Sequence, residues 1–348
     1  MSTLQMGLIV LGGLLLLVMA AHAVWTARKN RPRQAVPEEG AKPAGSETAL
    51  GAGIEPGLDM AAFDVVNFPL PTPEKRPTMD ALIDVIAPIA LETPVSGDAA
   101  LAAMPATRRA GSKPFAIEGF NAASKSWEVP LAGQRYLSFQ AGVQLANRSG
   151  ALNEIEYSEF VIKTQAFCDA INGTPEFPEM REEVARAREL DHFAGDHDAQ
   201  LGFVVRARNS AWSPGYVQQN AAHLGFVAGV IPGRMLLPAS QAGLPPMLGL
   251  LFDAQAAMAE DMSQSAIREV AISLDVPQVD RAERPFERMR EVALTLAERM
   301  DGVVTDDNGL TLPPEAMDVI GNELGTLYDT LDRRDLSAGS ALARRLFS

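Results

Sequence analysis

Side chains able to bind a metal are concentrated in one short segment of the chain. His192, Asp196, His197 and Asp198 carry the imidazole and carboxylate groups that bind zinc in many proteins. The two histidines do not have the i, i+4 spacing that places two ligands on one face of a helix. We therefore interpret this segment as a solvated connector and predict no metal site.

Residues suited to covalent or acid-base catalysis are similarly isolated. His223 has neither a nucleophile motif nor a matching carboxylate beside it, and the sequence contains no glycine-rich phosphate loop and no Gly-x-Ser-x-Gly elbow. The single cysteine, Cys168, lies in the apolar pattern of Phe160, Phe167 and Ile171, which indicates a core residue, with a reactive thiol as the alternative. We predict no catalytic residue and no cofactor.

Composition narrows the class of protein. The chain has 348 residues, a formal net charge of -14 and 47% hydrophobic residues, which is enough apolar content for one large or two ordinary cores. Its concentrated basic cluster stands beside an apolar run near the N-terminus, so the rest of the chain lacks the basic surface of a nucleic-acid binder. A lone cysteine forms no internal disulfide, which suits a reducing cytoplasm.

The apolar run over 6–25 predicts a transmembrane helix. It contains no charged residue and matches the roughly 20 residues needed to cross a bilayer. A cleaved signal peptide is the alternative, because Ala21-His22-Ala23 imitates a cleavage site. Signal peptides carry positive charge before the apolar run, however, whereas here the charge follows it.

The charges after the run predict its orientation. Basic residues stay on the cytoplasmic side, so residues 1–5 are expected outside the cytoplasm and the C-terminal bulk inside it. The expected membrane-interface residues, which would also attract anionic lipid headgroups, are Trp25, Arg28, Lys29, Arg31 and Arg33. Residues 26–33 are thus expected to form a basic juxtamembrane segment on the cytoplasmic side.

Residues 34–79 are rich in Pro, Gly, Ala and Glu without a sustained apolar period, which is typical of a linker. As a flexible coil, a linker of this length reaches roughly 40 Å, enough to hold a folded module clear of the headgroups. One part of it, the segment 61–71, is apolar enough to dock on the folded part.

The remainder predicts an α+β fold of two tandem split β-α-β-like units, each an antiparallel sheet with helices on one face. In the first unit, 80–195, we expect strands over 81–91, 115–121 and 136–146, with Pro88 marking a bulge or an edge. Its expected helices cover 97–104, 156–171 and 177–193.

The second unit, 196–336, repeats this order before a tail over 337–348. Expected strands cover 198–207, 227–237, 246–254 and 267–277, and expected helices cover 213–226, 286–300 and 312–331. In both units a long helix stops at Asn-Gly or Asp-Gly and a second helix opens with proline, which suggests an ancient duplication. Chance similarity between two α+β units is the alternative.

The end of the second unit resembles the ZipA family of bacterial cell-division proteins. In that family a strand ending in Val-Pro leads to a long helix, then a Gly-Val-Val strand followed by acidic residues and a Thr-x-x turn, then a final helix. The matching residues are Val276-Pro277, Gly302-Val303-Val304 with Asp306-Asp307, Thr311-Leu312-Pro313, and near the N-terminus Trp25-Thr26-Ala27-Arg28-Lys29. The resemblance covers the anchor and 198–331, whereas 80–193 lies outside the family pattern.

The resemblance implies a peptide-binding site rather than an enzyme. Members of this family hold the C-terminal tail of the division GTPase FtsZ against the exposed face of an antiparallel sheet, where alternate side chains form an apolar trough. Transferred strand by strand, this implies a site formed by Leu201, Phe203, Val205, Ile231, Ala254 and Ser273. Two alternatives stay open: the three β-strand residues 201, 203 and 205 pack into a core, or the peptide site lies at a junction of the units or on the first unit.

The function that the resemblance implies is a membrane-anchored adaptor that tethers FtsZ to the bacterial inner membrane at the division septum. A generic inner-membrane scaffold for another partner, or a membrane-anchored hydrolase, are the alternatives. The sequence predicts no nucleic-acid partner and does not specify an oligomeric state.

Overall fold

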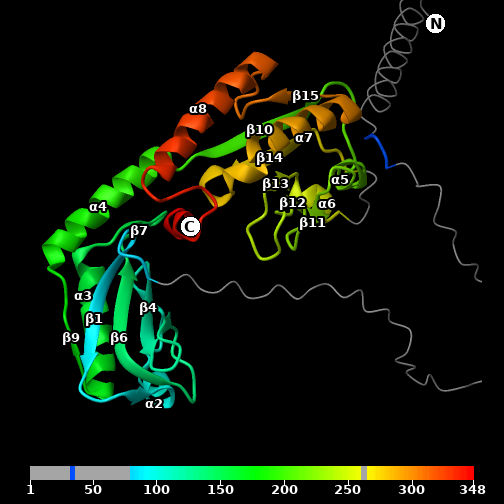
Figure 1. The fold of residues 1–348 in the computed structure, drawn as a ribbon. Coiled ribbons are helices and arrows are strands. Elements are labelled where there is room, and N and C mark those ends of the chain that lie inside the picture. The colour runs from blue at the N-terminus through cyan, green and yellow to red at the C-terminus, as the bar shows by residue number, and fades with distance from the viewer. Residues whose placement is uncertain (1–31, 36–78, 260–264) are drawn as a thin grey trace, which may run out of the picture. The chain divides into compact units, whose positions relative to one another are not determined.

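The structure, a computed structural model, describes residues 32–35, 79–259 and 265–348 (Figure 1). The predicted transmembrane helix over 6–25 and nearly all of the predicted linker lie outside these residues. Within them the chain forms antiparallel sheets and helices, which confirms the predicted α+β class.

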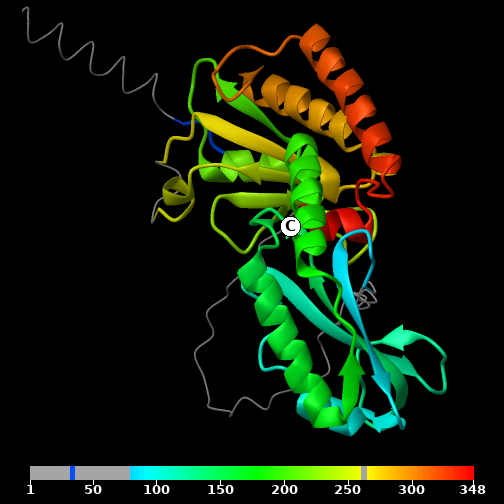
Figure 2. The same cartoon turned by 90° about the vertical axis from the view of Figure 1, so that its left-hand side faces the viewer.

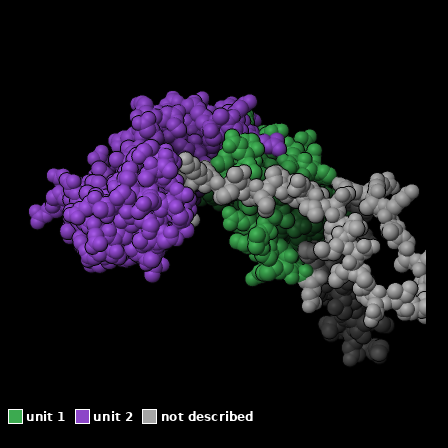
Figure 3. Space-filling view, turned by 60° about the horizontal axis from the view of Figure 1, so that its bottom comes forward, with its two compact units in different colours: residues 1–74, 202–272, 290–312 green, residues 75–201, 273–289, 313–348 purple. Residues whose placement is uncertain are grey.

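The described residues fall into two compact units (Figure 3). One unit contains 79–201, 273–289 and 313–348, and the other contains 32–35, 202–259, 265–272 and 290–312. The two units therefore interleave along the chain, whereas the sequence predicts consecutive units over 80–195 and 196–336. The difference arises because the C-terminal residues pack with the first sheet.

The first sheet has the strand order β3-β4-β6-β1-β9, with β2 paired to β6 and β5 paired to β4. A separate hairpin, β7 with β8, follows β6. The strands are β1 (Asp84–Leu91), β2 (Val95–Ser96), β3 (Arg109–Ala110), β4 (Lys113–Asn121), β5 (Trp127–Glu128), β6 (Arg135–Gln144), β7 (Ala146–Asn147), β8 (Gly150–Ala151) and β9 (Gly173–Pro175).

Helix α3 (Glu154–Ile171) covers one face of this sheet (Figure 2). Phe160 and Phe167 lie on its buried stripe and meet aromatic rings of the sheet edge-on, with centroid separations of 6.1 Å to Phe115 and 5.3 Å to Phe139. Asn153 begins the helix with a capping box, as its side chain accepts from the backbone of Ile155 and Glu156. The other helices of this unit are α2 (Gly97–Ala103), α4 (Met180–His197), α8 (Pro314–Asp332) and α9 (Ala341–Leu346), and the 3-10 helices are η1 (Val276–Gln278) and η2 (Arg281–Glu283).

Pro88 lies in an interior strand, because β1 is flanked by β6 and β9. Its carbonyl accepts from the backbone of Glu176, one residue beyond the end of β9, so the missing N–H of the proline falls where the neighbouring strand has already ended. Pro88 therefore lies at a local edge, as expected, and β1 and β6 pair without a bulge.

The second sheet has six strands in the order β11-β12-β13-β14-β10-β15. Helices α5, α6 and α7 interrupt it along the chain (Figure 1). Its elements are β10 (Gln200–Ala207), α5 (Pro214–Ala222), β11 (Val227–Ala228), β12 (Arg234–Leu237), β13 (Leu248–Leu251), α6 (Ala254–Ala257), β14 (Glu269–Asp275), α7 (Pro285–Met300) and β15 (Gly302–Thr305).

Trp212 is the largest side chain in the core of the second unit. It is fully buried, and its indole Nε1–H donates to the backbone carbonyl of Met300 at 2.7 Å, so the C-terminal end of α7 is fixed beside it. Val205 and Trp212 both lie within 3.4 Å of the position that a Cβ on Gly302 would occupy. The side of β10 that carries Val205 therefore faces this core.

The predicted strand over 227–237 is wrong in one respect, because it is a hairpin. Residues between β11 and β12 form a turn, in which Gly233 has a φ of +76° that favours glycine. The backbone of Gly229 then donates to the carbonyl of Arg234 at 2.8 Å. The pair Pro232-Gly233 is a turn signal within this stretch, and it separates the two strands.

The order of strands repeats in the two sheets. In the first sheet, the eight-residue strand β1 lies between β6, which precedes the long helix α3, and β9, which follows it. In the second sheet, the eight-residue strand β10 lies between β14, which precedes the long helix α7, and β15, which follows it. Both long helices are followed by a residue in the left-handed region, Asn172 with φ 54° and Asp301 with φ 55°. A Cβ on the next residue, Gly173 or Gly302, would lie 2.8 Å from a side-chain carbon of the eight-residue strand, so only glycine fits there. This repetition agrees with the predicted duplication, which stays a prediction.

The C-terminal tail is part of the folded unit. Leu346 and Phe347 are buried, and Gln278 Nε2 donates to the carbonyl of Phe347 at 2.7 Å. The guanidinium of Arg345 makes two hydrogen bonds to the carboxylate of Asp84, at 2.5 and 2.9 Å, and Asp84 is 2% exposed. The tail thus supplies the counter-charge for a buried carboxylate of the first sheet.

We expect Arg345→Ala to lower the free energy of unfolding by about 3 kcal/mol, because it leaves the Asp84 carboxylate buried without its counter-charge. Urea unfolding of the single variant, compared with Asp84→Asn/Arg345→Ala, measures this effect. The double variant should recover part of the loss. A single variant as stable as the wild type would show that the ion pair contributes no net stability.

Cys168 is completely buried on α3, which agrees with its interpretation as a core residue. Burial, and secondarily the charge of Asp169, raises the pKa of the Cys168 thiol to about 11. The thiol is therefore protonated at neutral pH and poorly nucleophilic.

We expect a thiol reagent such as Ellman's reagent to leave Cys168 unmodified in the folded protein at pH 8 and to modify it fully in denaturant. The absorbance of the released thiolate measures both. Stoichiometric reaction under native conditions within minutes would instead support the reactive-thiol alternative.

Candidate peptide-binding face

Strand β10 presents two different faces. Leu201, Phe203 and Val205 alternate with Gly202, Val204 and Arg206. Phe203 is 2% exposed and Val205 is fully buried, on the side of the strand that faces Trp212. The structure therefore places Phe203 and Val205 in the core, as the alternative interpretation expected. Neither side chain is exposed to a peptide.

The other three residues of the implied site do not lie on one strand face. Ile231 is exposed, but it lies in the turn between β11 and β12 rather than on a strand. Ala254 begins helix α6 rather than lying on a strand, because the chain turns after β13, where Phe252 donates its backbone N–H to Gly233. Ser273 is on β14 and exposed. The structure does not bring the six residues together on one face.

Ser273 identifies the face of the second sheet that remains open. It alternates with the buried Ile272 and Leu274 and shares a side of β14 with Glu269 and Ala271. Glu269 pairs with Arg206 across the strands, with a nitrogen to oxygen separation of 3.6 Å. The face therefore includes Val204 and Arg206 of β10, which is the side opposite to Phe203 and Val205.

Exposed apolar side chains gather on the same face over the hairpin strands. Leu236 lies directly opposite Val227 on one side and Gly249 on the other, and Leu251 lies opposite Arg234. Directly opposed residues share a face, so Val227, Leu236 and Leu251 lie on one side of the sheet. Val227 is 52% exposed and Leu251 is 53% exposed. We call the surface formed by Val227, Leu236, Gly249, Leu251 and Ala271 the open-face strip.

A loop closes one end of this face. A Cβ on Gly202 would lie 3.0 Å from the carboxylate of Asp307, and one on Gly309 would lie 3.0 Å from the Arg206 guanidinium. The loop after β15 therefore lies over β10, and Val204 is only 8% exposed. Access is consequently limited to the strands from β11 to β14.

The alternating residues of β10 carry a signal for which face of the strand is exposed. The set Leu201, Phe203 and Val205 contains no polar residue, as expected for a buried face, whereas the alternate set ends with the charged Arg206. A charge on one face of a half-buried strand marks the solvent side. Similarly, the buried Met235 and Leu237 on either side of Leu236 show that Leu236 points to solvent.

Of the predicted membrane-interface residues, only Arg33 is described by the structure; Trp25, Arg28, Lys29 and Arg31 lie outside the described residues. Arg33 forms a parallel bridge with Trp212: its N–H donates to the Ala211 carbonyl at 2.7 Å, and its carbonyl accepts from Ser213 at 2.9 Å. Its guanidinium pairs with Asp301 at 2.9 Å. Arg33 is therefore bound to the second unit rather than available for headgroups.

Within the described ranges, the structure contains no helix that is both long and apolar enough to cross a membrane. The predicted span over 6–25 is not among these residues.

The histidine and carboxylate segment forms separate contacts. His192 lies 3.5 Å from Asp196, His197 stacks on Phe193, and Asp198 pairs with Arg148 at 2.6 Å. In the part of the chain that the structure describes, no group of three or more potential ligands could hold a metal ion.

A search of curated proteins finds no match to this chain. Residues 253–323 match the family model described as ZipA, C-terminal FtsZ-binding domain. The match begins just before α6 and extends through β14, α7 and β15 into α8, so it includes Ala271 of the open-face strip. The predicted resemblance to the ZipA family is thereby confirmed for residues 253–323 of this chain.

Proposed function

We propose that this protein is a cell-division adaptor that binds the C-terminal tail peptide of FtsZ on the open-face strip and is anchored in the bacterial inner membrane. The observation that carries the proposal is the exposed apolar strip on a sheet whose β14 and β15 lie within the matched family segment. A binding domain of this family requires an exposed apolar sheet surface, and this face provides one.

The strip suits a short amphipathic peptide. Gly249 lies directly opposite Leu236 of β12, and because it has no side chain the surface is lower beside that leucine. Arg234 and the pair Arg206 with Glu269 border it with charge. Apolar peptide side chains would cover Val227, Leu236 and Leu251, while polar peptide atoms stay in water at the charged rim.

Anchoring in the membrane rests on the apolar run over 6–25 and on the basic residues that follow it. The contacts of Arg33 support a short connection between such a span and the second unit. With the span ending at Trp25, the eight residues to Arg33 reach at most about 28 Å. The proposed binding unit would therefore stay close to the cytoplasmic leaflet, at the division septum.

We expect Leu251→Glu to weaken binding of an FtsZ tail peptide by about 2 kcal/mol or more, which is roughly 30-fold in Kd, because a carboxylate would be pressed against apolar peptide side chains. Fluorescence anisotropy of a labelled peptide measures the loss. Leu294→Glu is the matched control, since Leu294 is 41% exposed on α7 and lies outside the strip. The control should bind like the wild type.

Phe203→Glu provides the complementary test of the implied site. It should unfold the unit, seen as lost helical circular dichroism or insolubility, because Phe203 is buried beside the core. Normal peptide binding by folded Leu251→Glu would move the peptide site away from the open-face strip. Failure of the wild type to bind the peptide would favour a scaffold for another partner.

We expect a reporter that is active only in the cytoplasm to be active when fused after Ser348, and a reporter that is active only in the periplasm to be silent there. The reason is the basic segment after the apolar run, which stays on the cytoplasmic side. A fusion to residues 1–33 alone is the control, because it contains the span and its four basic residues without the folded units. Periplasmic activity after Ser348 would contradict the orientation and remove FtsZ as a partner.

A further inference from the structure

Strand β4 has a gap in its outer edge. Its first residues pair with β3 through Lys113 and Pro114, and its last residues pair with β5 through Gly119 and Phe120. Between these two short strands, no described strand pairs with residues 115–118 on that side. The edge therefore offers unpaired backbone groups at the middle of β4.

The orientation of the backbone follows from one hydrogen bond. Phe115 donates its N–H away from β6, to the carbonyl of Arg108 at 3.0 Å. Backbone groups alternate in direction along an antiparallel strand, so the N–H and C=O of Ile117 also point away from β6, into the gap. Ile117 is thus the position at which one further extended residue can make two hydrogen bonds.

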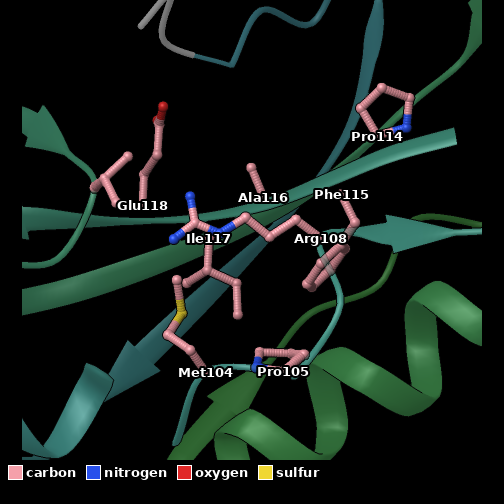
Figure 4. Close-up of a pocket in the computed structure, with 9 residues that line it drawn as sticks. Met104, Pro105, Arg108, Pro114, Phe115, Ala116, Ile117 and Glu118 are labelled. Atoms are coloured by element: carbon pink, nitrogen blue, oxygen red, sulfur yellow. The ribbon is translucent and has the colours of Figure 1, made fainter. Parts of the chain in front are cut away.

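A cavity of about 260 Å³ lies at this gap (Figure 4). Met104, Pro105, Phe115, Ile117 and Val129 supply its apolar lining. Its volume is below the roughly 300–1,000 Å³ of typical small-molecule sites, and it suits one or two apolar side chains. The backbone gap and the cavity together have the form of a site for an added β-strand.

Charge gives the site a preference. Arg108 lines the cavity, and its side chain extends along β4 in the close-up (Figure 4). Among the residues that the structure describes, Arg108 makes no ion pair. An occupant with apolar side chains at alternate positions and one carboxylate between them would satisfy both the cavity and the guanidinium.

We propose that residues 61–71 of the same chain bind at this gap and add a short strand to β4. This segment lies outside the described residues, and its sequence carries Phe63 and Val65 on either side of Asp64. Alternation directs Phe63 and Val65 to one face, toward the cavity, and Asp64 to the other, within reach of Arg108. Its β-branched and aromatic residues favour an extended strand.

The place where the chain re-enters the structure favours this occupant. Met79 donates its backbone N–H to the carboxylate of Glu118 at 3.3 Å, and Glu118 lines the same cavity. The twelve residues between 66 and 79 reach up to about 40 Å, so the segment can arrive at the gap in either strand direction. A segment attached so near has an effective concentration on the order of millimolar, so even a weak contact is occupied intramolecularly.

Amide hydrogen exchange of the full chain in detergent tests this proposal. The Ile117 amide should exchange slowly in the wild type, and Val65→Asp should accelerate it about tenfold or more, whereas amides of β1 should be unaffected. Leu50→Asp is the matched control, because it makes the same change outside 61–71 and should leave the exchange of Ile117 unchanged. Arg108→Glu should also accelerate exchange, and Asp64→Arg in the same chain should restore protection.

Three results would overturn the proposal. The first is equal exchange of Ile117 in the wild type and in Val65→Asp. The second is protection that rises with protein concentration, which would identify a second copy as the occupant. The third is an Ile117 amide that becomes protected only after a separate peptide is added, which would identify a partner in trans. None of these results depends on whether FtsZ binds the open-face strip.

Discussion

The hydrogen bond from the Trp212 indole to the Met300 carbonyl fixes which side of the second sheet is buried. It holds the end of α7 against the side of β10 that carries Phe203 and Val205, and both residues are removed from solvent. A strand whose one face is buried must present its alternate residues on the other. Paired strands bury the same side of the sheet. Leu237 and Leu250 are buried, so their neighbours Leu236 and Leu251 point outward.

The two sheets share an order of strands but differ in the polarity of the face opposite their long helix. In the first sheet, Glu118 and Gln140 lie directly opposite each other and are hydrogen-bonded at 2.8 Å on the face away from α3. That face is polar at its centre, whereas the equivalent face of the second sheet carries Leu236 and Leu251. An apolar peptide would lose hydrogen bonds on the first surface and bury apolar area on the second. The same architecture can therefore support binding on one sheet and not on the other.

Elements with strong local signals could be predicted from the sequence. Helix α3 was expected over 156–171 and covers Glu154–Ile171, because its apolar stripe and the Asn172-Gly173 stop are both local features. The hairpin of β11 and β12 was missed although Pro232-Gly233, a turn signal, interrupts the apolar residues on either side of it. Which face of β10 is buried is only weakly encoded, because Gly202 and Val204 are non-polar like Leu201, Phe203 and Val205, and only Gln200 and Arg206 mark the other face as polar. The contact of the tail with Asp84 joins residues 261 positions apart, a relation that periodicity does not encode.

The contacts of Arg33 change the role expected for the predicted linker, residues 34–79. As a linker between membrane and module, residues 34–79 would allow a reach of roughly 40 Å. Arg33 is bound to Trp212 and Asp301, however, and Met79 is bound to Glu118, so both ends of the segment 36–78 are attached to folded structure. Under the proposed topology, the distance from the membrane to the binding unit is then set by the eight residues that follow Trp25.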